Sequence, residues 1–455
     1  MQRLLFRNAF IVNSNRIFTG DLLAENGKIT ALGRGLPDRD AHVIDANGKY
    51  LLPGGVDPHT HFDLDVGFTR ASDNFYTGTI AAAFGGTTTV IDHMAFGPPG
   101  CRLTHQAEVY HNLAARSVVD YGFHGVFQHV DDDVLLDMAR LKADGITSLK
   151  LYLTYRPNML SDPDALSVLV RAKELGLVIC AHCENDAIVS HLRAELKQAE
   201  KTQARFHPVS RPPEAEAEAV YRFLSLAKAA GEPQVYVVHL SSKAGLMALA
   251  ALREAGQRNI FAETCPQYLY LDDSRYDDDA EGLKYIMCPP LRKQQDLDAL
   301  WAGLASTDID VIGTDHCPFF FQTQKQRGAA DFTLCPTGAP GVELRMSLLF
   351  SECLQGRMPL PRMVRLCCTS PAVIFGLGDR KGDIVPGLDA DLVLFDPTAS
   401  WVVTQSRLHE NVDYTPYEGM QLTGRPVMTV SQGEIIVENG IFTGSPGRGR
   451  YLKRH

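Results

Sequence analysis

Eight short apolar runs along the middle of the chain constrain its fold more than any other feature. They occupy residues 54–62, 86–94, 121–127, 148–153, 177–183, 235–242, 260–265 and 311–317. Segments with helical periodicity separate many of them, for example residues 165–176 and 215–231. Nearly continuous apolar runs that alternate with helices are typical of parallel strands covered by helices. Eight such units in roughly 320 residues predict an α/β fold, a (β/α)8 TIM-like barrel. A doubly wound sheet is the alternative.

Both ends of the chain have a different pattern. Residues 3–52 form short alternating runs broken by turn signals, and similar runs return at 382–397 and 426–444. Alternation of this kind predicts antiparallel strands. Because chain termini often lie close together, we expect one small β-sandwich built from residues 1–53 and 376–455, beside a barrel of residues 54–375.

The composition argues against several classes of protein. The 455 residues include 44 Lys and Arg against 54 Asp and Glu, a formal net charge of −10. A nucleic-acid-binding protein would carry clustered basic charge. The one basic cluster is the C-terminal segment RGRYLKRH, which we interpret as a solvated or partner-contacting tail. No apolar run approaches the ~20 residues that span a membrane, and the N-terminus lacks the pattern of a signal peptide. With ten cysteines in a leaderless chain, we expect a cytoplasmic protein.

Most of the eight runs end in side chains that can bind metal ions. A barrel places its active site at the C-terminal ends of its strands, so we expect these side chains at one rim. They are His59, His61, Lys150, His182, His239 and Asp315. His59 and His61 are two positions apart in a strand, so both imidazoles point to one face and suit zinc or a similar divalent ion. His93 and His316 are candidates for the shell around these ligands.

Lys150 is out of place in its strand, SLKLYLTY. An isolated buried ammonium loses its hydration, and at about 4 Å from two divalent ions it would be strongly repelled even at an effective dielectric of about 20. Lys150 must therefore turn away, lose its proton or change chemically. A neutral amine reacts with CO₂ to give a carbamate, an anion whose two oxygens can bridge two metal ions. The alternative is that the side chain extends to the rim and pairs with an acid.

Several ordered segments resemble the cyclic amidohydrolases, and among these the dihydropyrimidinase/hydantoinase branch. They are GGVDPHTHFD, the isolated strand lysine, AHCEND, VVHLSS, ETCPQYL, CPPLR and GTDHCPF, and they extend over nearly the whole chain. DHMAFGPPGCRLTHQ and DYTPYEGM are further similar to bacterial D-phenylhydantoinases. The resemblance implies a barrel enzyme that hydrolyses a small cyclic diamide and assembles as a homotetramer.

The resemblance also implies a role for each residue of the rim. Two divalent metal ions, most consistent with zinc, are expected. His59, His61 and Asp315 would bind one ion, His182 and His239 the other, and Lys150, carboxylated on its side-chain nitrogen, would bridge both. Water activated by the ions would attack the ring carbonyl. Asp315 would pass a proton from that water to the leaving nitrogen, and Tyr155 would donate a hydrogen bond to the developing oxyanion.

Two expected substrate-binding positions depart from the family pattern. The family commonly has Ser-Pro-Pro-Leu where this chain has Cys288-Pro-Pro-Leu, and Asn-Gly where this chain has Thr337-Gly. In relatives both positions contact the ring chiefly through backbone groups. Substitution can therefore preserve binding while changing which ring substituent fits.

Asp63 bears on the choice among cyclic amides. Dihydroorotase-like relatives bind a carboxylated substrate with an arginine two positions after the HxH pair, where this chain has Asp63, which would repel a carboxylate. Leu64, Phe68 and Phe96 are candidates for an apolar wall around a ring substituent, with ordinary packing as the alternative. We therefore expect hydrolysis of hydantoins, chiefly 5-substituted or aryl D-hydantoins, and/or dihydropyrimidines to N-carbamoyl amino acids. Allantoinase is the alternative activity. A non-catalytic dihydropyrimidinase-related scaffold is disfavoured because no expected metal ligand is missing.

Overall fold

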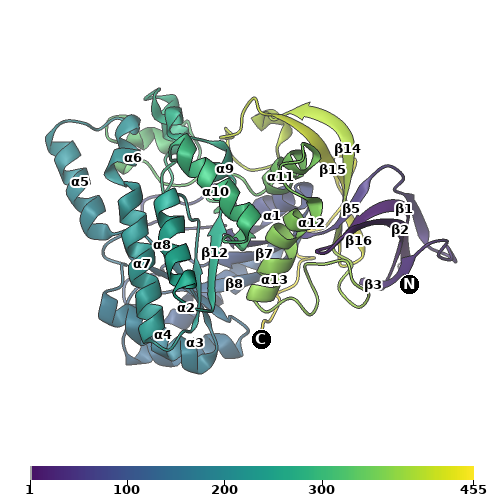
Figure 1. Ribbon diagram of the computed structural model, residues 1–455, viewed down its shortest axis with the longest axis horizontal. Helices are drawn as coiled ribbons and strands as arrows, with labels where there is room; N and C mark the ends of the chain where they lie inside the picture. Colours follow the sequence, from purple (N-terminus) through teal and green to yellow (C-terminus); the bar gives the residue numbers. More distant parts are fainter. Residues whose placement is uncertain (1–2) are drawn as a thin grey trace.

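The computed structural model describes residues 3–455 and has two parts (Figure 1). A barrel of parallel strands wrapped by helices forms the larger part, and a second sheet lies beside it. The N-terminal strands, purple in Figure 1, and the yellow-green C-terminal strands join in this second sheet. Within the described range, no helix is both long and apolar enough to cross a membrane.

The barrel contains eight parallel strands that neighbour one another in chain order. They are β6 (Gly55–Thr60), β7 (Thr87–His93), β8 (Asp120–Val126), β9 (Ser148–Tyr152), β10 (Val178–His182), β11 (Gln234–Val237), β12 (Ile260–Thr264) and β13 (Val311–Ile312). Each strand overlaps one of the eight apolar runs, so the predicted barrel is confirmed. A doubly wound sheet would reverse its strand order at a switch point, and the order from β6 to β13 has no reversal.

The first and last barrel strands, β6 and β13, meet at a seam to which side chains contribute most of the hydrogen bonds described below. Among residues 3–455, no strand ladder joins the two. The His61 amide donates to the His316 carbonyl at 2.9 Å. The buried Asp57 carboxylate accepts hydrogen bonds from the Thr314 amide at 3.2 Å and from the Thr314 hydroxyl at 2.7 Å. Arg345 Nη1 donates to the carbonyl of Val56 on β6 at 3.0 Å and to that of Ile312 on β13 at 2.9 Å. An isolated main-chain bridge between Thr60 and His316 also crosses the seam. Two buried charged side chains thus supplement sparse main-chain pairing where the barrel closes.

The α-helices lie mainly between successive strands in the chain and cover the barrel. They are α1 (Phe75–Phe84), α2 (Leu103–Leu113), α3 (Asp132–Ala143), α4 (Asp162–Leu175), α5 (Asp186–Gln198), α6 (His207–Ser210), α7 (Pro213–Ala229), α8 (Lys243–Glu254), α9 (Gln267–Tyr270), α10 (Gln294–Ser306), α11 (Arg345–Leu354), α12 (Leu360–Val364) and α13 (Ser370–Ile374).

Helix α4 illustrates how the sequence specifies these elements. The Ser161 side chain accepts a hydrogen bond from the Asp164 amide and caps the first turn. The buried residues recur at helical spacing and form one apolar face: Ala165, Val168, Leu169 and Ala172. Gly176 ends the helix with a φ of 66°, a left-handed conformation that glycine adopts without a steric penalty.

Strands from both ends of the chain form the second sheet, which has nine strands. Its N-terminal members are β1 (Arg3–Val12), β2 (Ile17–Glu25), β3 (Lys28–Gly33), β4 (His42–Asp45) and β5 (Tyr50–Pro53), and its C-terminal members are β14 (Leu392–Val402), β15 (Gln421–Ser431), β16 (Glu434–Glu438) and β17 (Ile441–Phe442). The antiparallel pair β5–β14 joins the two ends, with Leu52 opposite Val393. The expected union of the termini is confirmed, whereas the domain boundaries at 53/54 and 375/376 stay a prediction.

The C-terminal segment, expected to be a solvated or partner-contacting tail, packs against the barrel instead. The Leu452 amide donates to the Tyr121 carbonyl of β8 at 2.8 Å. Arg454 is 1% exposed and donates to Ser148 Oγ at 2.8 Å and to the Phe123 carbonyl. The prediction was wrong because two oxygens of neighbouring strands, on β8 and β9, accept hydrogen bonds from the guanidinium. These partners are remote in the sequence, so local composition did not reveal them.

Replacing Arg454 tests this packing. We expect Arg454→Met to lower the free energy of unfolding by about 1–3 kcal/mol, because two buried oxygens lose their donor. The matched control is Arg450→Met, since Arg450 belongs to the same segment but is exposed; it should change stability by less than about 0.5 kcal/mol. Urea unfolding followed by circular dichroism measures both variants. Equal losses would contradict a packing role specific to Arg454.

Candidate metal centre

One cavity of about 850 Å³ opens at the C-terminal ends of the barrel strands. All nine residues predicted to bind metal or substrate line it: His59, His61, Lys150, Tyr155, His182, His239, Cys288, Asp315 and Thr337. A shared active site requires this common location. The individual roles of the nine residues stay predictions.

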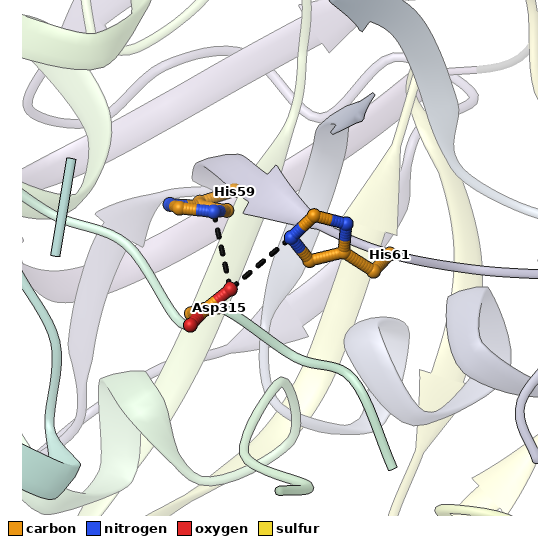
Figure 2. A group of neighbouring side chains, drawn as sticks. All are labelled: His59, His61 and Asp315. Atoms are coloured by element: carbon orange, nitrogen blue, oxygen red, sulfur yellow. Dashed lines mark ion pairs between the residues drawn. The ribbon is translucent and has the colours of Figure 1, made fainter. Parts of the chain in front are cut away.

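His59, His61 and Asp315 form a compact group in this cavity (Figure 2). His59 lies on β6, His61 directly follows that strand, and Asp315 follows β13 across the seam. One carboxylate oxygen, Asp315 Oδ1, is 3.1 Å from His59 Nε2 and 3.2 Å from His61 Nε2. The group therefore presents two imidazoles and a carboxylate at one point, which are donor types that zinc binds.

Burial and neighbouring charges set the protonation of this group. Burial lowers the pKa of His61 to about 4, so that its ring is neutral at pH 7. Burial also acts to lower the pKa of His59, but the Glu263 carboxylate, 2.5 Å from His59 Nδ1, raises it to about 9. Burial disfavours ionised Asp315, yet the adjacent imidazoles hold the pKa of Asp315 well below its usual range. Asp315 is therefore a carboxylate at neutral pH.

His182 and His239 form a second pair that adjoins the first group. Their ring centroids are 4.5 Å apart, and the His239 ring is 5.5 Å from that of His59. Glu184 lies 2.7 Å from His182 Nε2 and also pairs with the buried Arg211. The bond to Glu184 leaves Nδ1 as the remaining ligand atom of His182.

Lys150 is 1% exposed, and its charge affects the pKa of all four histidines. Its positive charge, like burial, opposes protonation of each of the four rings, although Glu263 keeps the pKa of His59 raised. Burial in turn lowers the pKa of Lys150 itself. Among residues 3–455, no acid forms an ion pair with Lys150. The alternative in which the lysine pairs with an acid at the rim is therefore not the arrangement found.

Two other buried lysines show what a buried ammonium requires. Lys381 Nζ lies 2.5 Å from each of two carboxylates. Lys325 Nζ donates to the main-chain carbonyls of Ile286 at 2.9 Å and Pro336 at 3.2 Å. Lys150 Nζ has no partner of either kind within the described part of the chain. An ammonium at that position is uncompensated, which a neutral amine or an anionic derivative would relieve.

Tyr155 lies beside the second pair of histidines. Its ring centroid is 4.9 Å from that of His182, and the Arg211 guanidinium is 5.3 Å from the ring. Burial raises the pKa of Tyr155 well above its ordinary value, so that the hydroxyl keeps its proton. Its φ of 72° is a left-handed conformation, a form of strain that persists where the surroundings impose it and that clusters at functional sites.

A main-chain hydrogen bond connects the loops that carry Cys288 and Thr337. The Gly338 amide donates to the Ile286 carbonyl at 3.0 Å. Gly338 has a φ of 149°, and a Cβ atom there would lie 2.2 Å from the Cys317 carbonyl oxygen. Only glycine fits this approach, so the position of Thr337 relative to Cys288 is fixed by backbone geometry.

Apolar side chains line the outer part of the cavity, although not all of the expected ones do. Leu64 and Phe96 line it as predicted. Phe68 does not: its side chain is 52% exposed, and the Arg327 guanidinium lies 5.0 Å from its ring in a cation–π contact outside the cavity. Val109 and Leu113 of α2 take part instead. Their spacing of four residues, which puts both on one helix face, was the signal available in the sequence.

The two further histidines differ in their surroundings. The His93 ring lies 5.2 Å from the His61 ring and 4.5 Å from the His59 ring, so it packs against the predicted ligands. His316 Nε2 is bound to Asp73 at 3.0 Å, and its Nδ1 accepts a main-chain amide. Both nitrogens of His316 are thus engaged away from the ligands, and the contacts support a place in the surrounding shell for His93 alone.

Sequence reasoning missed Glu184 and Glu263, the carboxylates that contact His182 and His59. Both are fully buried. Glu184 lies two positions after His182, and Glu263 lies within the apolar run at 260–265. A charged residue inside an apolar segment was the available signal, as it was for Lys150.

The residues of this centre fit divalent metal ions. Among the predicted ligands, three buried ring nitrogens have no hydrogen-bond partner in the described residues: His59 Nε2, His61 Nδ1 and His239 Nδ1. Buried polar atoms rarely stay unpaired. Imidazole nitrogens grouped with a carboxylate are suitable ligands for zinc and similar ions.

Comparison with known proteins agrees with this chemistry. The profile of the amidohydrolase family matches residues 50–436. The chain belongs to the amidohydrolase family. This amidohydrolase is 47% identical to a D-phenylhydantoinase from Escherichia coli O1:K1, with 99% of this chain and 98% of the relative covered.

Solved structures support the same assignment. A dihydropyrimidinase from Brevibacillus agri NCHU1002 is 42% identical, with a TM-score of 0.97 over 100% of this chain and 99% of that one. A D-hydantoinase from Bacillus sp. AR9 is 40% identical, with a TM-score of 0.96 over 99% of each chain. The resemblance to the dihydropyrimidinase/hydantoinase branch is thereby confirmed. The family implies a binuclear divalent metal site, for which this amidohydrolase has candidate ligands.

Proposed function

We propose that this amidohydrolase opens the ring of hydantoins, chiefly 5-substituted or aryl D-hydantoins, and/or dihydropyrimidines, to give N-carbamoyl amino acids. The observation that carries the proposal is the complete set of predicted ligands in one cavity of a chain 47% identical to a D-phenylhydantoinase. A scaffold protein without metal ligands does not fit this cavity, and no observation favours allantoinase. By resemblance, we also propose a cytoplasmic homotetramer.

The proposed cofactors are two divalent ions, most consistent with zinc. His59, His61 and Asp315 would hold one ion, His182 and His239 the other, and the carbamate of Lys150 would bridge them. When bound, such ions supply Lewis acidity that polarises an amide carbonyl and makes water nucleophilic near neutral pH. The carbamate forms when the neutral Lys150 amine attacks CO₂, making an N–C bond and releasing one proton. Burial lowers the pKa of Lys150 and so favours that neutral amine.

Asp315 is the proposed proton carrier. The adjacent imidazoles outweigh the effect of burial and keep the pKa of Asp315 well below its usual range, so it is ionised and able to accept a proton. It borders the cavity in which the ring would lie. In the proposed reaction it accepts a proton from the attacking water and delivers it to the ring nitrogen as the C–N bond breaks.

Tyr155 is the proposed oxyanion donor. Because burial raises the pKa of Tyr155 well above its ordinary value, its hydroxyl stays protonated and can donate a hydrogen bond where negative charge develops. Cys288 and Thr337 would contact the ring through backbone groups. Leu64, Phe96 and the α2 side chains offer an apolar surface to a ring substituent.

The bridging role of Lys150 predicts a specific rescue. Lys150→Ala should lose activity because the centre loses its shared anionic ligand, and propionate should restore part of the rate by replacing the carbamate. Propylamine, of similar size but opposite charge, is the control and should not rescue. Elemental analysis should find about two divalent ions in the wild-type chain, as expected for a two-metal site. Full activity of the unrescued variant, or active wild type without metal, would refute the mechanism.

The oxyanion role of Tyr155 predicts a split in the kinetic constants. Tyr155→Phe should lower kcat about 100- to 1000-fold, as removal of an oxyanion donor does, with a smaller change in KM. Tyr152→Phe is the matched control, because its ring lines the same cavity 5.8 Å from that of Tyr155. Steady-state kinetics with one hydantoin as substrate measures kcat and KM of both variants and of the wild type. An equal loss in both variants would assign the effect to packing.

A substrate panel tests the activity as a whole. We expect turnover of 5-phenylhydantoin, hydantoin or dihydrouracil, and poor turnover of dihydroorotate, because Asp63 borders the cavity where dihydroorotase-like relatives have an arginine. The rate of ring opening is measured for these four compounds and for allantoin, with a zinc titration of each active pair. Preference for dihydroorotate would overturn the argument from Asp63, and preference for allantoin would establish the alternative activity.

A further inference from the structure

Glu263, on β12, is a buried carboxylate to which the proposed reaction gives no role. Its side chain is 0% exposed. Oε1 lies 2.5 Å from His59 Nδ1 and accepts the His239 amide at 3.0 Å, while Oε2 accepts the Tyr236 hydroxyl at 2.9 Å. No lysine or arginine forms an ion pair with it in residues 3–455. A buried carboxylate is costly unless it is paired, and the partners of Glu263 are a predicted metal ligand, the backbone of a second one and a tyrosine hydroxyl.

The first bond orients His59. A carboxylate can only accept, so His59 Nδ1 carries the hydrogen of this bond, and Nε2 is left as the ring atom that can bind an ion once it is deprotonated. Nε2 is the atom that faces Asp315 at 3.1 Å. Ligand histidines in metal sites are commonly fixed by such a bond on the far nitrogen.

The second bond holds the backbone of His239. This residue has a φ of 37°, a left-handed backbone conformation that residues other than glycine seldom adopt. It lies two positions beyond the end of β11, where strand pairing no longer constrains the chain. Glu263 binds this turn twice: its carboxylate accepts the His239 amide at 3.0 Å, and its main-chain carbonyl accepts the Leu240 amide at 2.7 Å. The direction of the His239 side chain therefore depends on Glu263.

We propose that Glu263 is a positioning residue that couples the two halves of the metal centre. One oxygen atom, Oε1, orients His59 in the first half and His239 in the second, so loss of the carboxylate should disturb both halves together. The inference rests on the proposed two-metal centre and adds a residue from a strand that supplies no ligand to it.

Glu263→Gln is the test variant, because it keeps the shape of the side chain and removes its charge. We expect both ions to bind about 10- to 100-fold more weakly, the usual effect of removing a partner of a metal ligand. The full-length proteins are dialysed against a series of zinc buffers, and bound zinc per chain is measured by elemental analysis. This readout does not depend on turnover.

Two other buried glutamates provide matched controls. Glu184→Gln removes a carboxylate that contacts His182 alone among the four histidines, so one ion should weaken and the other should not. Glu216→Gln removes a buried carboxylate that accepts hydrogen bonds from Ser241 and Ser242 and touches no predicted ligand, so zinc binding should stay at the wild-type level. A loss caused merely by removing a buried acid would appear in Glu216→Gln as well.

The outcomes separate the inference from the function on which it rests. Wild type that binds no zinc refutes the two-metal centre itself. Wild type with two ions and a Glu263→Gln variant that binds both equally well, or weakens only one, overturns the coupling role alone. If Glu263→Gln fails to fold, Tyr236→Phe decides, because it removes only the bond to Oε2. If Tyr236→Phe then binds both ions more weakly than wild type, by a smaller factor than that expected for Glu263→Gln, the proposal is supported. If it binds both ions as tightly as wild type, the proposal is overturned.

Discussion

Closure of the barrel between β6 and β13 is the constraint on which the rest of the structure depends. β6 carries His59, and Asp315 follows β13, so the compact ligand group draws its members from strands that share no ladder in the described chain. The hydrogen bonds of Asp57 and Arg345 hold the two strands together. Neither of these side chains lines the cavity. The chemistry of the rim thus relies on charges buried in the barrel wall.

Charge compensation distinguishes the buried lysines that serve the fold from the buried lysine at the proposed metal centre. Lys381 and Lys325 are surrounded by oxygen acceptors and need nothing further. Among the described residues Lys150 has no such partner, and three ring nitrogens of the predicted ligands near it are likewise unpaired. An uncompensated group costs stability, so a concentration of such groups in one cavity indicates a site shaped for ions that the side chains themselves do not provide.

The parts of the fold that could be predicted are those that a local pattern specifies. Buried parallel strands are apolar along their length, so the eight runs were visible, and strand ends then located the ligand-type residues. The contacts made by the side chains of Arg454, Phe68 and Glu263 could not be predicted in this way. Each is decided by a partner far away in the chain: Ser148 for Arg454, Arg327 for Phe68 and the ligand histidines for Glu263. Periodicity contains no information about such pairs.

The position of the ligand group across the seam links metal binding to folding. An ion held by His59, His61 and Asp315 would bond to residues on both sides of the seam between β6 and β13, which has an isolated bridge but no ladder in residues 3–455. Such an ion would act as a cross-link between the first and last strands of the barrel. By mass action, a ligand present at 1,000 times its dissociation constant adds about 4 kcal/mol to the stability of the folded state. Removing metal should therefore loosen the barrel at its first and last strands.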